Sequence, residues 1–268
     1  MYDLGRQPLI VAHRGASALA PENTLAAFRM AIDVRAEGIE FDVRLSRDGR
    51  PVVIHDSTLE RTGRKAVSVS SLTAEELGRI DVGSWFNANH RKKADPRYSN
   101  ETVPTLADAL AALRDFRGVI YIELKCKDSE VRQLSSAVCS AISASPLVPQ
   151  IIVKSFKLAV IPHIRFECPG VKTAALFAPK IMRYLRKGKH LVKIAEEFGA
   201  DHLSLHYSLA THKLMKKVES SGIKVAIWTA DKPRWVDRGT ELGLFAIITN
   251  DPAKLLEAKY GRKVGRKT

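Results

Sequence analysis

Three side chains in residues 37–56, EGIEFDVRLSRDGRPVVIHD, could act together chemically: the carboxylates of Glu40 and Asp42 and the imidazole of His55. Glu40 and Asp42 alternate with apolar residues, and because successive side chains of a strand point to opposite faces, both carboxylates share one face. Asp48-Gly49 is a strong hairpin signal, and too few residues separate the two apolar runs for a parallel crossover. A turn centred on this dipeptide would place Asp42 opposite His55. Such same-face partners lie about 5 Å apart at Cβ, which suits a metal ligand beside a general acid or base.

Two further apolar runs also end in ionisable side chains. His13 and Arg14 directly follow the run of residues 8–12, as is typical of a buried parallel strand whose carboxyl end opens into a site. Glu123 and Lys125 stand in the strand-like run of residues 118–125, on the same face as each other. Chemically active residues are therefore expected at the ends of three strands.

The elements that must position these residues alternate regularly along the chain. Helical patterns, beginning at about Leu25–Val34, separate strand-like runs, and this alternation predicts a parallel sheet wrapped by helices, of the TIM-type (β/α)8 barrel class. Nine strand-like runs are present and eight close such a barrel, so we interpret the antiparallel arm at residues 51–55 as the extra one. The remaining predicted strands lie near residues 151–156, 172–177, 202–205, 223–228 and 244–248.

The stretch between His55 and the next strand contains one convincing helix. Thr73-Ala-Glu-Glu76 is a capping box that opens this helix, which is expected to run to about Ile80. Residues 87–100 are basic and polar, and we interpret them as an exposed loop. Thr105 is expected to cap the helix that follows.

No linker or change in composition divides the chain. We therefore predict a single domain over residues 1–258, with an insertion at about residues 57–104 and a basic tail at 259–268. The 268 residues, 45% of them hydrophobic, suffice for a full core. The three cysteines (Cys126, Cys139 and Cys168) lack C-x-x-C spacing, which favours free thiols in a reducing compartment. Because no signal-peptide core or long apolar run is present, we expect a cytoplasmic protein, soluble or peripheral to a membrane.

The charge balance is strongly basic. Lysine and arginine number 43 against 29 acidic residues, a net charge of +14, and the pI is about 9.8. Such an excess favours anionic partners, namely phosphate esters, nucleic acid or a membrane surface. No basic stretch interleaves aromatic residues, and no zinc-finger spacing or glycine-rich phosphate loop is present, so we expect no nucleic-acid partner.

Nine short motifs are spread over almost the whole chain. They are His13-Arg14-Gly15, Pro21-Glu22-Asn23-Thr24, Glu40-x-Asp42, Arg47-Asp48-Gly49, Pro51-Val-Val-Ile-His55-Asp56, Ile122-Glu123-Leu124-Lys125, Lys154-Ser155-Phe156, Trp228-Thr229 and Ile248-Thr249-Asn250-Asp251-Pro252. Together these motifs resemble the glycerophosphodiester phosphodiesterase family. Three positions depart from the family pattern: Asn250 stands where aspartate is common, Ala107 where glutamate is common, and no second threonine accompanies Thr62.

The resemblance implies a (β/α) barrel with a small insertion over its mouth that shapes substrate access. It also implies a divalent metal held by Glu40, Asp42 and Glu123, with a catalytic histidine pair, His13 and His55. Three hard oxygen ligands without clustered sulfur suit Mg²⁺ or Ca²⁺. Without a cation, three buried carboxylates would raise one another's pKa.

The implied reaction is hydrolysis of a glycerophosphodiester to glycerol 3-phosphate and an alcohol. Arg14 and Lys125 would stabilise charge on the phosphate oxygens, and two histidines that titrate near neutrality can divide the two proton transfers. Trp228 would pack against the glycerol carbons, with Phe156 as a second wall. The sequence assigns neither the acid nor the base, and the nucleophile is either water or a hydroxyl of the substrate.

Two other interpretations stay open. One is a phospholipase D-like activity on lysophospholipids by the same apparatus, and the other is a non-catalytic barrel that binds anionic lipid through its basic surface. For transient membrane recruitment, residues 180–193 permit a short basic amphipathic helix, with Arg183, Arg186 and Lys187 on its polar face. The alcohol group of the substrate and the oligomeric state are not determined by the sequence.

Overall fold

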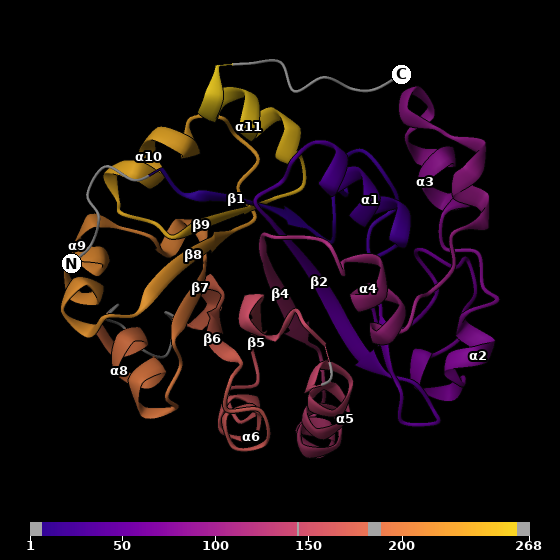
Figure 1. The fold of residues 1–268 in the computed structure, drawn as a ribbon, viewed down its shortest axis with the longest axis horizontal. Coiled ribbons are helices and arrows are strands. Elements are labelled where there is room, and N and C mark those ends of the chain that lie inside the picture. Colours follow the sequence, from indigo (N-terminus) through magenta and orange to yellow (C-terminus); the bar gives the residue numbers. More distant parts are fainter. Residues whose placement is uncertain (1–6, 144, 182–188, 262–268) are drawn as a thin grey trace.

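The computed structural model describes residues 7–143, 145–181 and 189–261, and eight parallel strands of these residues close into a barrel (Figure 1). Strand β1 pairs with both β2 and β9, which closes the sheet. The predicted barrel is therefore confirmed. Its strands are β1 (Leu9–His13), β2 (Gly38–Leu45), β4 (Val119–Leu124), β5 (Ile151–Ser155), β6 (Lys172–Phe177), β7 (His202–His206), β8 (Lys224–Trp228) and β9 (Ala246–Thr249).

Helices surround the barrel, and the apolar side chains that the strands point outward pack against them (Figure 1). The predicted caps are present, because Thr73 and Thr105 each form a capping box. Thr24, for which no cap was predicted, accepts a hydrogen bond from Ala27 N at the start of α1. The surrounding helices are α1 (Leu25–Asp33), α4 (Leu106–Ala112), α5 (Val131–Ser143), α6 (Val160–Glu167), α8 (Lys189–Glu197), α9 (His212–Val218), α10 (Trp235–Glu241) and α11 (Pro252–Tyr260).

The barrel interior changes from apolar to charged along its axis. Val11, Tyr121, Ile152 and Ile248 belong to one buried apolar cluster, and each is followed two residues later by a polar or charged residue on the same face of its strand. In parallel strands these later positions gather at the carboxyl edge. This edge of the barrel therefore carries the ionisable side chains.

Strand β3 (Pro51–Val53) runs antiparallel to β2, but the predicted register is wrong by one residue. Val43 pairs with Val53, and Ile54 N donates to Asp42 O at 3.0 Å, so Asp42 lies opposite Ile54 instead of His55. The cause is a three-residue loop. Ser46 and Arg50 close it, and Gly49 takes the left-handed conformation with φ +73°, whereas the prediction assumed a two-residue turn.

The insertion is more ordered than expected. Residues 87–100, predicted to be an exposed loop, contain the end of α3 (Ser84–Asn89) and two 3₁₀ turns at Arg91–Lys93 and Pro96–Asn100. Tyr98 is buried and stacks edge-on against Phe86, which packs on α1. The polar composition concealed these aromatic anchors. Helix α2 (Ala74–Leu77) ends three residues before the predicted end.

The remaining predictions concern the surface. Helix α11 continues to Tyr260, and the Lys259 ammonium pairs with Glu37 at 2.8 Å, so the first residues of the basic tail belong to the folded barrel. Arg183, Arg186 and Lys187 of the predicted membrane-binding segment lie outside the described residues. None of the helices in the described part of the chain has the length and apolar character needed to span a bilayer.

Candidate active site

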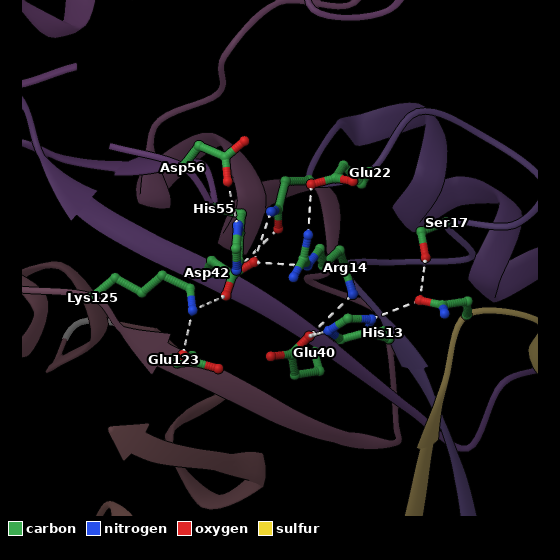
Figure 2. A network of polar contacts seen from close by, with 12 residues as sticks. His13, Arg14, Ser17, Glu22, Glu40, Asp42, His55, Asp56, Glu123 and Lys125 are labelled. Atoms are coloured by element: carbon green, nitrogen blue, oxygen red, sulfur yellow. Dashed lines mark hydrogen bonds and ion pairs between the residues drawn. The ribbon is translucent and has the colours of Figure 1, made fainter. Parts of the chain in front are cut away.

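Three carboxylates meet at the carboxyl edge of the barrel (Figure 2). Glu40 and Asp42 come from β2 and Glu123 from β4, and the register places Asp42 beside Glu123. All three are buried, with exposed fractions of 0%, 1% and 6%, and a ligand oxygen from each lies within 4.8 Å of the others. Such a set of hard oxygen donors is suited to a divalent cation such as Mg²⁺ or Ca²⁺.

Two ammonium groups lie among these carboxylates. Lys154 on β5, only 2% exposed, places Nζ 2.8 Å from Glu40 Oε1 and 3.4 Å from Glu123 Oε2. Lys125 follows β4 and contacts both Glu123 and Asp42, at 3.3 Å from Asp42 Oδ1. Buried charges are tolerated only when they are paired, and here each carboxylate has a cationic partner.

These cations decide the ionisation of the carboxylates. Burial by itself would raise the pKa of Asp42, but the charges of Lys125 and Arg14 outweigh it and hold that pKa well below its usual range. Burial likewise opposes ionisation of Glu40, yet Lys154 and His13 keep its pKa lowered. Asp42 Oδ1 is buried and accepts no hydrogen bond from the described residues. Ionised carboxylates, one of them with a buried oxygen that accepts no hydrogen bond, fit a metal ion.

His13 lies at the carboxyl end of β1, beside Glu40. Its Nδ1 is 2.7 Å from Asn250 Oδ1, and its Nε2 is 3.9 Å from Glu40 Oε2. The ring is therefore held on one side and presents Nε2 to the carboxylates (Figure 2).

His55 follows β3, where the chain has left the strand pairing, and its ring lies beside Asp42 (Figure 2). Its Nδ1 is 2.6 Å from Asp56 Oδ1, so it too is held at Nδ1 and directs Nε2 toward the site. Burial lowers the pKa of His55, against the opposing effect of Asp42. His55 thus lies beside Asp42 although the register differs by one residue from the predicted one (Figure 2). The chain leaves the strand pairing before His55, so this side chain does not follow the alternation of the strand.

The turn between β1 and α1 supports Asp42 from a second side. Arg14 Nε lies 3.2 Å from Asp42 Oδ2, and Asn23 donates to the same oxygen from Nδ2 at 2.9 Å. Both residues have a positive φ, +54° and +57°, a conformation that non-glycine residues adopt at a cost and that often marks functional sites. Gly15 (φ +75°) is required here, because a Cβ would come within 2.6 Å of Ala27 Cβ.

Trp228 stands apart from the ionisable group. It ends β8, donates from Nε1 to Ser204 O at 3.2 Å, and packs edge-on against Phe156 and His206 with centroids 5.7 Å and 5.4 Å away. Phe156 is 45% exposed, which is unusual for so large an apolar side chain. These rings form an aromatic wall on the rim of the barrel.

The structure brings together the three carboxylates, the two histidines, Arg14 and Lys125 that the sequence suggested (Figure 2), with Trp228 at a distance on the rim. The residues that hold them were not predicted. Lys154 had a signal, since a lone lysine inside an apolar strand needs a buried partner. Asn23, Asp56 and Asn250 stand in motifs of the resemblance, yet nothing in their spacing shows which side chain each one contacts.

Comparison with known proteins adds independent support. The model of the glycerophosphoryl diester phosphodiesterase family matches residues 13–254. The glycerophosphodiester phosphodiesterase of Caldanaerobacter subterraneus subsp. tengcongensis is 30% identical over 250 residues, which cover 92% of this chain and 96% of that protein. The glycerophosphodiester phosphodiesterase of Bacillus subtilis (strain 168) is 28% identical over 260 residues, covering 94% and 87%.

A solved structure agrees with both relatives. The phosphodiesterase of Oleispira antarctica, determined in complex with its product sn-glycerol-3-phosphate, is similar with a TM-score of 0.83 and 25% identity, over 94% of this chain and 97% of that one. Family model, relatives and fold agree over nearly the full length. The chain therefore belongs to the glycerophosphoryl diester phosphodiesterase family, a family of enzymes.

Proposed function

We propose that this protein hydrolyses glycerophosphodiesters to glycerol 3-phosphate and an alcohol in a metal-dependent reaction, with His13 and His55 as the proton-transfer groups. The observation that carries the proposal is the arrangement around the buried carboxylates. Two histidines from different strands are each held at Nδ1, by Asn250 and Asp56, so that both direct Nε2 toward the same acidic centre. Phosphodiester hydrolysis needs charge stabilisation at the phosphoryl oxygens and proton transfer at two oxygens, and one cation site with two proton-transfer groups can supply both.

Glu40, Asp42 and Glu123 would hold the metal, for which Mg²⁺ and Ca²⁺ fit the oxygen donors. When bound, the ion would neutralise charge on the phosphoryl oxygens. Two further cations, Lys125 and Arg14, lie at the mouth of the barrel. Their side chains are 15% and 18% exposed, so a phosphate that enters from solvent can contact both of them.

The two histidines divide the proton transfers. One takes the proton of the attacking hydroxyl, whether of water or of the glycerol moiety, and the other gives a proton to the oxygen that leaves. Because each Nδ1 is already hydrogen-bonded, Nε2 is the nitrogen that each ring offers to the substrate.

The rim supplies the walls for the rest of the substrate. Trp228 and the exposed Phe156 are placed to pack against glycerol carbons. The insertion approaches the same edge of the barrel, since Lys93 donates to Ala18 O in the turn after β1 and Arg61 pairs with Glu22. We propose that it limits how large an alcohol group the mouth accepts.

One assay tests the proposal. Purified full-length protein is given glycerophosphocholine or lysophosphatidylcholine, with Mg²⁺, with Ca²⁺, or with a chelator, and glycerol 3-phosphate and free choline are measured. We expect glycerol 3-phosphate from glycerophosphocholine only when metal is present. Choline release from lysophosphatidylcholine alone would show a lysophospholipid-specific enzyme, and turnover that survives complete chelation would contradict the metal site.

A further inference from the structure

His13 is connected to a second acidic residue, Asp231, through Asn250. Asn250 directly follows β9, and its Oδ1 lies 2.7 Å from His13 Nδ1. On its other side, Asn250 donates to Asp231 twice, from Nδ2 to Oδ2 at 2.9 Å and from the backbone N to Oδ1 at 2.8 Å. Thr249 Oγ1 also donates to Asp231 Oδ1, at 2.9 Å. Asp231 is thus held by three donors, and it holds the Asn250 amide in turn.

The chemistry of these groups allows only one orientation of the Asn250 amide. A carboxylate accepts hydrogen bonds and cannot donate them, so the amide NH₂ must face Asp231 and Oδ1 must face His13. Ser17 Oγ, which donates to the same Oδ1 at 3.1 Å, agrees with this orientation. Because an amide oxygen only accepts, His13 Nδ1 must carry a hydrogen.

The tautomer of neutral His13 follows from this chain of hydrogen bonds. With the hydrogen on Nδ1, the lone pair is on Nε2, the nitrogen that lies 3.9 Å from Glu40 Oε2. Asn250 and Asp231 thus determine which ring nitrogen His13, on the neighbouring strand β1, presents to the site.

We propose that Asn250 and Asp231 are positioning residues that fix His13 in the Nδ1–H tautomer and hold its ring with Nε2 toward the carboxylates. The kinetic part of this proposal rests on the proposed function, whereas the tautomer is a property of the resting protein. An imidazole in the wrong tautomer cannot exchange a proton with the substrate through Nε2, so the defect should appear in kcat.

The test compares four full-length proteins labelled with ¹⁵N-histidine: the wild type, Asn250→Ala, Ser17→Ala, and the double variant Asn250→Asp/Asp231→Asn. Ring-nitrogen chemical shifts of His13 are recorded at about pH 9, where an ordinary imidazole is neutral. A His13→Gln sample assigns the signals. Steady-state kinetics with glycerophosphocholine and saturating metal are measured on the same proteins.

We expect Nδ1–H in the wild type and a shift toward Nε2–H in Asn250→Ala, with kcat at least about 10-fold lower and KM within about twofold. Ser17→Ala removes the other donor to Oδ1 and should keep the Nδ1–H tautomer. The double variant exchanges amide and carboxylate, which reverses the hydrogen bond between positions 250 and 231 but leaves a side-chain oxygen at position 250 to accept from His13 Nδ1. It should therefore keep the tautomer and recover kcat relative to Asn250→Ala.

Two results would overturn the proposal: His13 that keeps Nδ1–H in Asn250→Ala, or a double variant no better than Asn250→Ala in both readouts. Failure of the proposed function has a different signature. In that case the wild type releases no glycerol 3-phosphate from any glycerophosphodiester, while the chemical shifts still report the tautomer.

Discussion

At the scale of single residues, the site is a balance of buried charges in which every ionisable side chain has a specific partner. Lys154 and Glu40 are almost completely buried, and their pairing costs the desolvation of two charges. Such a pair is weak evidence for stability, but the removal of one partner leaves an uncompensated buried charge. The two histidines that we propose for proton transfer differ from these, because His13 and His55 are partly exposed and reach solvent.

The histidines can therefore be replaced at little cost to the fold. We expect His13→Ala and His55→Ala each to lower kcat by roughly 10²–10⁴-fold, the usual contribution of one general acid or base. Metal affinity, measured by isothermal titration calorimetry, should stay close to that of the wild type, because neither residue belongs to the carboxylate set. His212→Ala on the exposed start of α9 is the control. Wild-type turnover in either site variant would contradict the assignment.

Lys154 is expected to matter most when no metal is bound. Lys154→Met leaves Glu40 buried without its partner, so the free energy of unfolding in the presence of a chelator should fall by about 3–5 kcal/mol. Saturating Mg²⁺ or Ca²⁺ should raise the free energy of unfolding of Lys154→Met by more than it raises that of the wild type. The ion replaces the positive charge that the variant lacks. Urea denaturation with and without metal measures both quantities.

Lys157→Met is the matched control, because Lys157 lies just after β5, the strand that contains Lys154, but forms an exposed ion pair with Asp128. Exposed pairs contribute about 0–1 kcal/mol, so this variant should unfold almost as the wild type does. A Lys154→Met protein as stable as Lys157→Met under chelation would disprove the charge balance described above.

At the scale of elements, the insertion does more than cover the barrel. Arg61, which follows β3, donates from Nε to Asp56 Oδ2 at 2.7 Å and from both terminal nitrogens to Glu22. Asp56 in turn holds His55, and Glu22 holds Arg14. One guanidinium thus connects the supports of two site residues that come from different strands.

Arg61→Ala should therefore impair catalysis without a loss of metal. We expect kcat to fall at least about 10-fold, because small misplacements of a catalytic group cost that much or more. Arg61→Lys should recover only part of the loss, since an ammonium cannot reproduce the two-sided fork that reaches both carboxylates. Arg79→Ala removes an exposed ion pair with Glu75 on α2 and serves as the control. Equal rates for the Arg61 and Arg79 variants would show that the insertion only covers the site.

At the scale of the whole molecule, the end of the barrel away from the site is apolar and contains one buried histidine. His202 on β7 is 2% exposed, its Nδ1 lies 3.3 Å from Tyr121 OH, and its ring packs edge-on against Phe245. Burial lowers the pKa of His202 from 6.5 to about 3. The folded barrel therefore requires this ring to be neutral.

The consequence is an acid-sensitive component of stability. Below pH 6.5 the unfolded chain binds a proton at His202, whereas the folded chain binds one there only near pH 3. The contribution of neutral His202 to the free energy of unfolding is therefore fully present above pH 6.5 and is lost progressively as the pH falls toward 3. Its slope approaches about 1.4 kcal/mol per pH unit. His202→Gln, neutral at every pH, should show a smaller fall in unfolding free energy between neutral and acidic pH than the wild type.

Urea denaturation at several pH values measures the difference, and His212→Gln, which removes an exposed histidine, should follow the wild-type curve. If the wild type and His202→Gln lose stability in parallel, His202 accepts its proton inside the barrel and the interpretation is wrong.

The sequence by itself determined the barrel and most of the acidic centre. Strand periodicity placed Glu40 and Asp42 on one face, and the alternation of helices and strands predicted parallel strands whose carboxyl ends meet. Those two regularities are local, so they can be read along the chain. They placed His13 at the carboxyl end of its strand and Glu123 on one face of another, and the resemblance to the family joined both to Glu40 and Asp42.

Only the tertiary structure decided which side chains hold the site together. His13 and Asn250 are 237 residues apart and Arg61 and Glu22 are 39 apart, so their contacts exist only because the barrel closes and the insertion folds back. The hairpin register likewise depended on a three-residue loop that the Asp48-Gly49 signal does not distinguish from a two-residue turn. Contact between distant residues follows from closure and packing, which no local pattern encodes.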